Sequence, residues 1–202
     1  TFVPSIYFDI IRMHLSKAQI KWVRSLQLKK NRDAEGVFVA EGEKCVNELR
    51  NAFELVLLAT PDNATSTEIE QMSSLRTPQG TIGVFRKPAS DTRYPTDELI
   101  LALDGIQDPG NLGTIIRSSL GFNVRNIAII TPAVDHFDPK TIRSSMGAIF
   151  NLNIELFNSF EEYQNKFNNY HSANLSRIFD DLSINFVMAS ASIGLCARQA
   201  KS

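Results

Sequence analysis

The chain has 202 residues, a mass of 22.6 kDa and a formal net charge of -1. Hydrophobic residues make up 43% and charged residues 21% of it, which excludes a wholly disordered or collagen-like chain. No apolar run reaches the roughly 18 to 20 residues that span a bilayer, and Cys45 and Cys196 lack the spacing of a zinc or redox motif. These features predict a folded protein with free thiols in a cytoplasmic compartment, without a membrane segment or a metal site.

The amino-terminal third carries an uneven charge. Thr1–Arg12 lack the features of a signal peptide and precede Met13, a natural start, so we expect them to lie outside the fold. From Arg12 to Arg32 there are seven basic residues and no acidic one, so the rest of the chain sums to -8 against the overall -1. Such a segment is typical of proteins that bind polyanions, because each phosphate contact releases counterions. A solvated helix face is the alternative that charge alone leaves open.

A helix is predicted at the start of this basic segment. Ser16 and Gln19 have the spacing of a capping box, which marks a helix amino terminus. Lys17, Lys21 and Arg24 then fall on one face of the helix, which would remain in solvent. The opposite face is apolar and can pack on a core: Ile20, Trp22, Val23 and Leu26.

The following residues alternate between strand and helix patterns. Residues 60–80 are polar and show no clear element, and Pro88–Asp97 have the composition of a linker. We therefore expect a small α/β domain over 13–87 and a linker over 88–97. The predicted elements of this small domain are strands at Val37–Ala40, Leu55–Ala59 and Thr81–Phe85, with a helix at Glu43–Arg50.

A second domain is expected over 98–202. Leu99–Leu103 and Ile127–Ile130 are continuous apolar runs, as in buried parallel strands, and Asn111–Leu120 between them has the length of a helix. This strand, helix, strand order predicts a βαβ unit, so the fold class is α/β with a parallel sheet. Further predicted elements are helices at Pro139–Met146 and Phe160–Phe167 and strands at Ile149–Leu156 and Ile184–Met188.

The densest candidate for a functional site is the segment Asp104–Arg117 (DGIQDPGNLGTIIR), which follows a predicted buried strand. Ligand sites in open α/β sheets lie at the carboxyl ends of strands. Its glycines fit neither the dinucleotide fingerprint nor the phosphate loop, which weighs against a nicotinamide or nucleotide triphosphate enzyme. In a purely structural role, Pro109 and Gly110 would make the turn and Asn111 would cap the helix. Arg117 would then be an ordinary surface or ion-paired residue.

A second polar cluster follows at Asp138–Phe150. Lys140 and Arg143 are three residues apart on a predicted helix, so both side chains can address one anionic group. Gly147 fits the end of that helix or a close approach of the backbone. A plain helix with a glycine stop is the alternative that spacing alone favours.

Together these segments resemble the SpoU, or TrmH-type, RNA ribose methyltransferases of the SPOUT superfamily. Asn111, Gly113 and Arg117 match the family's N-x-G-x-x-x-R motif. The segment Lys140–Phe150 (KTIRSSMGAIF) matches its second motif. Two motifs in the right order make the resemblance specific.

The resemblance covers about Leu15–Leu156. Within it, Leu15–Lys44 and Thr77–Phe85 are similar to the family's substrate-binding domain, which is related in fold to ribosomal proteins that bind RNA. The family's third region, which completes a carboxyl-terminal knot and the cofactor site, is not found between His171 and Ser202. We therefore expect weak or no binding of S-adenosylmethionine by this chain, and a sequence that is truncated or altered after about residue 170.

The resemblance implies methyl transfer from S-adenosylmethionine to a ribose 2′-hydroxyl of structured RNA, either rRNA or tRNA. Arg117 would lie at the hydroxyl and Asn111 would orient Arg117 or the ribose. A guanidinium with a pKa above about 12 is a poor proton acceptor, so stabilising the alkoxide and positioning a phosphate suit Arg117 better than the role of base. Near the substrate or cofactor loop we expect Gly113, Ser145, Gly147 and Ala148.

RNA is the partner that these features imply, with a homodimer if the second domain is complete. A module that binds RNA without methylating it is the main competing function, because the basic segment alone could supply the affinity. A nicotinamide-dependent enzyme fails on the glycine pattern. The residues expected to contact RNA are Lys17, Lys21, Arg24, Lys29, Lys30, Lys140 and Arg143.

Overall fold

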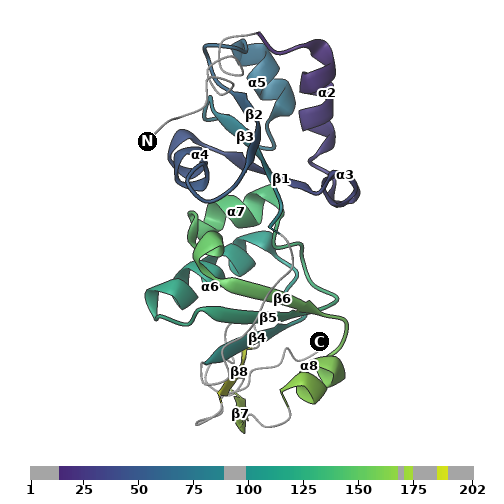
Figure 1. Ribbon diagram of the computed structural model, residues 1–202, viewed down its shortest axis with the longest axis vertical. Helices are drawn as coiled ribbons and strands as arrows, with labels where there is room; N and C mark the ends of the chain where they lie inside the picture. Colours follow the sequence, from purple (N-terminus) through teal and green to yellow (C-terminus); the bar gives the residue numbers. More distant parts are fainter. Residues whose placement is uncertain (1–13, 89–98, 168–170, 175–185, 191–202) are drawn as a thin grey trace. The chain divides into compact units, whose positions relative to one another are not determined.

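The computed structural model describes residues 14–88, 99–167, 171–174 and 186–190 (Figure 1). The expected extraneous segment Thr1–Arg12 and all but the first residue of the expected linker lie outside these residues. Tertiary contacts divide the chain into two units. The first unit is Thr1–Ala89 with Phe137–Arg143, and the second is Ser90–His136 with Ser144–Ser202.

The first unit contains a three-stranded antiparallel sheet. β1 (Val37–Glu41), β2 (Leu55–Ala59) and β3 (Ile82–Arg86) lie in the order β1-β3-β2. The last strand in sequence is therefore the central one, paired with both earlier strands. All three predicted strands are confirmed to within a residue at either end.

Residues 14–88 of the first unit also form four helices: α2 (Lys17–Ser25), α3 (Lys29–Glu35), α4 (Glu43–Leu49) and α5 (Ser66–Met72). The sequence predicted α2 and α4 but missed α3 and α5. The predicted capping box of α2 is confirmed, since the Ser16 N–H donates to Gln19 Oε1 at 2.9 Å and the Gln19 N–H donates to Ser16 Oγ at 3.3 Å.

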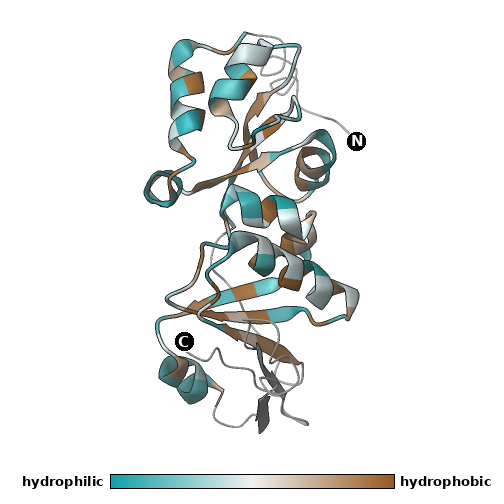
Figure 2. Cartoon of the chain, turned by 180° about the vertical axis from the view of Figure 1, so that it is seen from behind, coloured by the Kyte–Doolittle hydropathy of each residue, from teal (hydrophilic) through white to brown (hydrophobic). Residues whose placement is uncertain are grey.

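The core of the first unit forms between α2 and the sheet. Ile20, Val23 and Leu26 are at most 6% exposed and pack with residues of all three strands. Burying each such side chain is worth roughly 1.5–3 kcal/mol, so the apolar face fixes the helix and leaves its basic face in solvent. Figure 2 shows this division as alternating hydrophilic and hydrophobic segments along α2.

Arg32 departs from the basic segment to which the sequence assigned it. Its side chain is 1% exposed, and its Nη1 donates to the carbonyl oxygens of Leu26 at 2.9 Å and Gln27 at 2.8 Å. These carbonyls end α2, so the buried guanidinium ties α3 to the end of the preceding helix. Arg32 therefore belongs to the structural core of this unit and not to its surface.

The second unit contains a five-stranded mixed sheet in the order β6-β5-β4-β8-β7. β4, β5 and β6 run parallel, which confirms the predicted βαβ unit. β8 pairs antiparallel with β4, and β7 pairs antiparallel with β8. The strand expected at Ile184–Met188 is present as β8, two residues later. The strands are β4 (Ile100–Asp104), β5 (Asn126–Ile130), β6 (Asn153–Phe157), β7 (His171–Asn174) and β8 (Phe186–Ser190).

The helices of the described chain from residue 99 onward are α6 (Pro109–Gly121), α7 (Pro139–Ser145), the 3-10 helix η1 (Ala148–Asn151) and α8 (Phe160–Lys166). The predicted strand Ile149–Leu156 was wrong in its first half. Ala148 and Ile149 form η1 and pack against α6, and β6 begins only at Asn153. A short apolar run does not by itself distinguish a buried strand from a buried turn of helix.

The parallel strands carry separate cores on their two faces. Leu103, Ile127 and Ile129 face α6 and η1, whereas Ala102, Ala128 and Ile130 face Tyr163 and Phe167 at α8 (Figure 1). Helices on both faces explain why these strands read as continuous apolar runs. In the described part of the chain, every helix is too short or too polar to cross a membrane.

Candidate active site

The loops after β4 and β5 are joined at the carboxyl ends of these strands. Gly105, with φ of 73°, follows β4, and its N–H donates to the Ile130 carbonyl at 3.4 Å. The amide of Gln107 donates to the carbonyl oxygens of Gly105 at 3.2 Å and Pro132 at 2.9 Å. These bonds fix the point at which α6 begins, so residues on the first turns of α6 have a defined position.

The start of α6 corrects the structural role considered for Asn111. Asp108 is the N-cap and accepts the Asn111 N–H at 2.8 Å, while Pro109 and Gly110 lie inside the helix. The prediction that Asn111 caps the helix was therefore wrong. Its side chain is exposed and makes no hydrogen bond to any residue that the structure describes, so the amide is available to a ligand.

Arg117 lies just under two turns beyond Asn111 on α6 and is exposed. Its Nη1 donates to the thioether sulfur of Met146 at 3.1 Å. It forms no ion pair within the described ranges, so the ion-paired interpretation fails. A thioether carries no charge, so the positive charge of the guanidinium remains available to an anion.

The last residues of α7 and the segment that follows are held against α6. Ser144 Oγ donates to the Pro109 carbonyl at 3.2 Å, and Ser145 is fully buried. Gly147 has φ of 80°, a conformation that glycine adopts without strain, and Ala148 after it is 5% exposed. Gly113, on the buried side of α6, is enclosed as well. The expected loop residues therefore have packing roles here, and their contact with substrate or cofactor stays a prediction.

Lys140 and Arg143 are exposed on α7, one turn apart as expected. Tertiary contacts group them with the first unit, whereas Asn111 and Arg117 belong to the second. Within the first unit Phe137 stacks on Phe38 with ring centroids 5.2 Å apart. The ammonium of Lys87 lies 5.1 Å from the centre of the Phe137 ring.

The basic face of the first unit is defined here as Lys17, Lys21 and Arg24 of α2. All three are exposed and have no ion-pair partner among residues 14–88 and 99–167. Opposite charges in their surroundings do not neutralise them, which suits a phosphate-binding surface.

The two lysines of α3 differ from each other in pairing. Lys29 forms an ion pair with Asp33, which is also 2.5 Å from Lys87 Nζ, whereas Lys30 is exposed with no such partner in the described chain. Partial burial raises the pKa of Asp33, but hydrogen bonds from Lys29 and Lys87 outweigh this and hold the pKa below its ordinary value. Lys29 is therefore the weaker of the two candidates for a phosphate contact.

Metal and thiol chemistry find no support in the described residues. They contain no group of three or more His, Cys, Asp or Glu side chains placed to hold a metal ion. Cys45 is a free thiol, as expected, and burial, with a smaller effect of Glu48, raises its pKa to about 11. Since the thiolate is the nucleophile, this thiol is inert near neutral pH. Cys196 lies outside the described residues.

Comparison with known proteins identifies the fold and the family. The SpoU rRNA Methylase family matches residues 98–184, and the MRM3-like substrate binding domain matches residues 17–71. A putative RNA methyltransferase of the TrmH family from Porphyromonas gingivalis is 32% identical, with a TM-score of 0.68 over 76% of this chain and 67% of its own. The chain belongs to the SpoU family of RNA methyltransferases. The family match extends past Leu156, where the resemblance was expected to end.

Two further relatives indicate the chemistry of this SpoU family. The 23S rRNA (guanosine(2553)-2′-O)-methyltransferase RlmP of Bacillus subtilis is 27% identical over 66% of this chain and 60% of its own. The rRNA methyltransferase of Sinorhizobium meliloti, solved with AdoMet bound, is 26% identical, with a TM-score of 0.68 over 80% of this chain and 69% of that one. Use of S-adenosylmethionine is thus supported for the family.

The curated relatives are longer than this chain. The mitochondrial rRNA methyltransferases 3 of mouse, human and two Xenopus species are 31 to 40% identical in the aligned segment, which covers only 22 to 43% of their length. The region in which the family's third motif was expected falls largely on residues 175–185 and 191–202, outside the described part. The predicted absence of that motif, and of the knot it completes, stays a prediction.

Proposed function

We propose that this protein methylates a ribose 2′-hydroxyl of rRNA, with S-adenosylmethionine as the methyl donor. The observation that carries the proposal is the exposed Arg117, whose charge is not neutralised within the described chain. It shares a helix with Asn111, and that helix begins at the carboxyl end of β4, where α/β sheets place their ligands. The family membership and the 2′-O-methyltransferase among its relatives support the same reaction.

In this reaction Arg117 stabilises charge and does not accept the proton. The ribose hydroxyl loses its proton to solvent water as its oxygen attacks the methyl carbon, and the bond from that carbon to sulfur breaks with its electron pair left on sulfur. A guanidinium stays protonated at any physiological pH, but its planar fork can donate to the alkoxide and to a neighbouring phosphate together. One such donor is worth about 10² to 10³ in kcat. Asn111, with a free amide on the same helix, orients the ribose or the guanidinium.

The described residues that would border the cofactor are Gly147 and Ala148, and they fit this role. S-adenosylmethionine, when bound, supplies an electrophilic methyl group on a sulfonium sulfur. Both residues are buried, but Gly147 has no side chain and a positive φ, and Ala148 adds only a methyl group, so neither presents a bulky side chain to a ligand beside this segment. The remainder of the expected site lies outside the described residues.

RNA is bound, in this proposal, through the basic face of α2 together with Lys30, Lys140 and Arg143. These side chains are exposed on short helices. Buried apolar residues such as Ile20 and Ile142 anchor α2 and α7, and the buried Arg32 anchors α3. Trp22, the single tryptophan, is partly buried against the core, so the surface contacts phosphates and does not offer that ring for base stacking. Binding is therefore governed by charge and falls steeply with salt.

The test is a methyl transfer assay with purified protein, radiolabelled S-adenosylmethionine and rRNA, followed by alkaline hydrolysis. Because the 2′-oxygen attacks the adjacent phosphate during hydrolysis, a methylated ribose survives as an alkali-resistant dinucleotide. We expect label in that dinucleotide. Label that is released with single nucleotides would show base methylation and contradict the proposal.

RNA binding without any transfer would favour the competing function, an RNA-binding module. One observation favours that alternative: the basic face lies in the first unit, which has its own sheet and core. A homodimer, implied by the sequence resemblance, is part of our proposal for the complete protein and is tested by light scattering. The cytoplasmic location stays a prediction.

A further inference from the structure

Met146 makes a contact with Arg117 that the sequence did not reveal. Arg117 Nη1 donates to Met146 Sδ at 3.1 Å, across 29 positions of sequence. Both residues belong to the second unit. The sulfur is a weak and neutral acceptor, so it orients the guanidinium without neutralising it. An aspartate or glutamate in its place would orient Arg117 more firmly but would compete with an anionic ligand for its charge.

The backbone at Met146 is unusual for a residue with a side chain. Its φ is 50°, in the left-handed region where glycine and asparagine are favoured, and Gly147 after it has φ of 80°. Residues in such conformations persist where the surrounding structure imposes them, and they concentrate at functional sites. Here the surroundings do impose the conformation, since Ser145 before Met146 is fully buried and Ala148 after it is 5% exposed.

Core packing does not explain why this position holds methionine. The Met146 side chain is 58% exposed, although its neighbours on both sides are buried. Glycine would occupy the same backbone conformation without strain. The residue therefore contributes through its side chain, and the contact that the structure gives this side chain is the one with Arg117.

We propose that Met146 is a positioning residue for methyl transfer, whose thioether holds the Arg117 guanidinium in place while leaving its full charge for the ribose oxygen. This role rests on the proposed function, in which Arg117 stabilises the alkoxide. Four of the five N–H donors of a guanidinium remain for the RNA when one is held by sulfur. The segment after α7 thereby determines the orientation of a side chain on α6.

Three substitutions separate a positioning role from a structural one. Met146→Leu keeps the volume and removes the acceptor, so we expect kcat to fall about tenfold, as small misplacements of reacting groups do, with the KM for RNA unchanged. Met146→Gln returns an unbranched acceptor and should recover most of the loss. Met146→Gly relieves the strain, so its melting temperature should equal or exceed that of the wild type while its kcat falls. A structural role would move melting temperature and activity together.

A double-mutant cycle with Arg117→Ala completes the test on the full protein. We expect Met146→Leu to have no further effect on kcat once Arg117 is absent. Ser118→Ala, an exposed neighbour of Arg117, is the control and should leave kcat unchanged. With an active wild type, two outcomes overturn the positioning role alone. One is a Met146→Leu variant with the wild-type kcat, and the other is a Met146→Leu substitution that lowers kcat by the same factor in the Arg117→Ala background as in the wild type. A wild type that transfers no methyl group overturns the proposed function, and this role falls with it.

Discussion

Two arginines, one in each unit, show how the surroundings of a side chain decide what the same chemical group does. Arg32 is buried, donates to two carbonyl oxygens at the end of α2, and holds α3 to that helix. Arg117 is exposed, touches a neutral sulfur, and keeps its charge available. In the structure both arginines lie within helices, Arg32 in α3 and Arg117 in α6. The difference lies in the acceptors that the fold brings to them. Replacing Arg117 should therefore lower kcat, whereas replacing Arg32 should lower the stability of the first unit.

The largest effect is expected at Arg117. Arg117→Ala removes the donor to the developing alkoxide, so kcat should fall by about 10² to 10³ with a smaller change in RNA affinity. Arg117→Lys should restore little, because an ammonium lacks the planar fork that holds two oxygens together. Single-turnover methyl transfer at saturating RNA and cofactor measures both variants. An alanine variant with the wild-type rate would remove Arg117 from the catalytic site.

The next largest effect is expected from the basic face of the first unit. Replacing Lys17, Lys21 and Arg24 by alanine should weaken RNA binding and flatten the slope of affinity against salt by up to about 2.7, at about 0.9 for each lost duplex phosphate contact. Filter binding across a salt series measures this slope.

The matched control removes the same charge elsewhere in the first unit. Lys44, Arg50 and Arg76 are also exposed, and their replacement by alanine should change the slope much less. Equal slopes for the two triple variants would show that the overall charge of the unit, and not this face, governs RNA binding.

Replacing Arg32 is expected to lower the free energy of unfolding without a direct effect on methyl transfer or RNA binding. Arg32→Met fills the space but leaves the buried carbonyl oxygen of Leu26 and the partly buried one of Gln27 without these donors, at a cost of about 1–3 kcal/mol. Denaturant unfolding measures the cost, and Arg50→Met on the surface is the control. If Arg32→Met impaired RNA binding at unchanged stability, Arg32 would belong to the binding surface after all.

A smaller effect is expected at Asp33, whose replacement should strengthen RNA binding where replacement of the basic face weakens it. Asp33→Asn removes the charge that pairs Lys29 and Lys87, so both ammonium groups become available to phosphate. RNA affinity should rise a few-fold at low salt and the salt slope should steepen by up to about 1.8. An unchanged slope would show that neither lysine lies near bound RNA.

The sequence predicted most elements with strong periodicity and failed where tertiary contacts decide. The apolar face of α2 and the strands β4 and β5 were predicted correctly, since their patterns reflect burial directly. α3 contains no apolar residue except Ala34, so the buried Arg32 anchors it, and no sequence pattern signals that. At the candidate site, the motif located Asn111 and Arg117 on one helix. The contact with Met146 depends on how the segment after α7 packs, which spacing along the chain does not encode.

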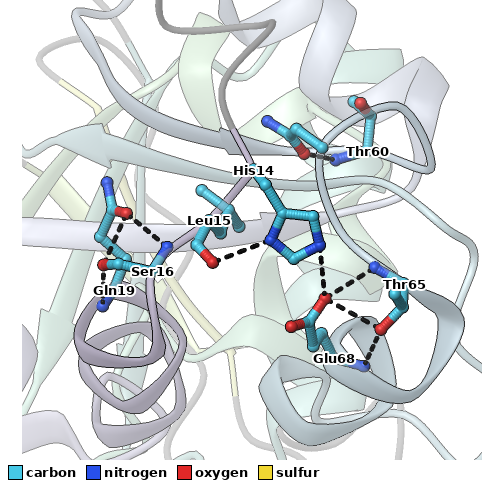
Figure 3. A network of polar contacts seen from close by, with 8 residues as sticks. His14, Leu15, Ser16, Gln19, Thr60, Thr65 and Glu68 are labelled. Carbon is cyan, nitrogen blue, oxygen red and sulfur yellow. Dashed lines mark hydrogen bonds and ion pairs between the residues drawn. The ribbon is translucent and has the colours of Figure 1, made fainter.

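α5 was missed although the sequence held its signal. Thr65 and Glu68 form a capping box of the same kind that predicted α2, with the Thr65 N–H donating to Glu68 Oε2 at 2.8 Å (Figure 3). The helix has seven residues, of which only Ile69 and Met72 are buried, too few to show a period. Short helices of this kind are better found by their caps than by their hydrophobic pattern.

The smallest expected effect concerns acid stability at this capping box. The pKa of Glu68 is lowered chiefly by the Thr65 backbone N–H, then by the Thr65 hydroxyl, with a further contribution from His14 at 3.3 Å. A carboxyl whose pKa is lower in the folded state stabilises the fold at pH values above its unfolded-state pKa, about 4.3. This contribution is lost as the pH falls through the folded-state pKa. Glu68→Gln keeps the acceptor and removes the titration, so its melting temperature should decline less than that of the wild type below about pH 4.3.

A second variant separates the two hydrogen bonds of Thr65. Thr65→Val removes the hydroxyl and keeps the backbone N–H, so the pKa of Glu68, followed by carbon NMR of its carboxyl group, should rise but stay below its ordinary value. A full return to the ordinary value in Thr65→Val would show that the hydroxyl, and not the backbone N–H, dominates.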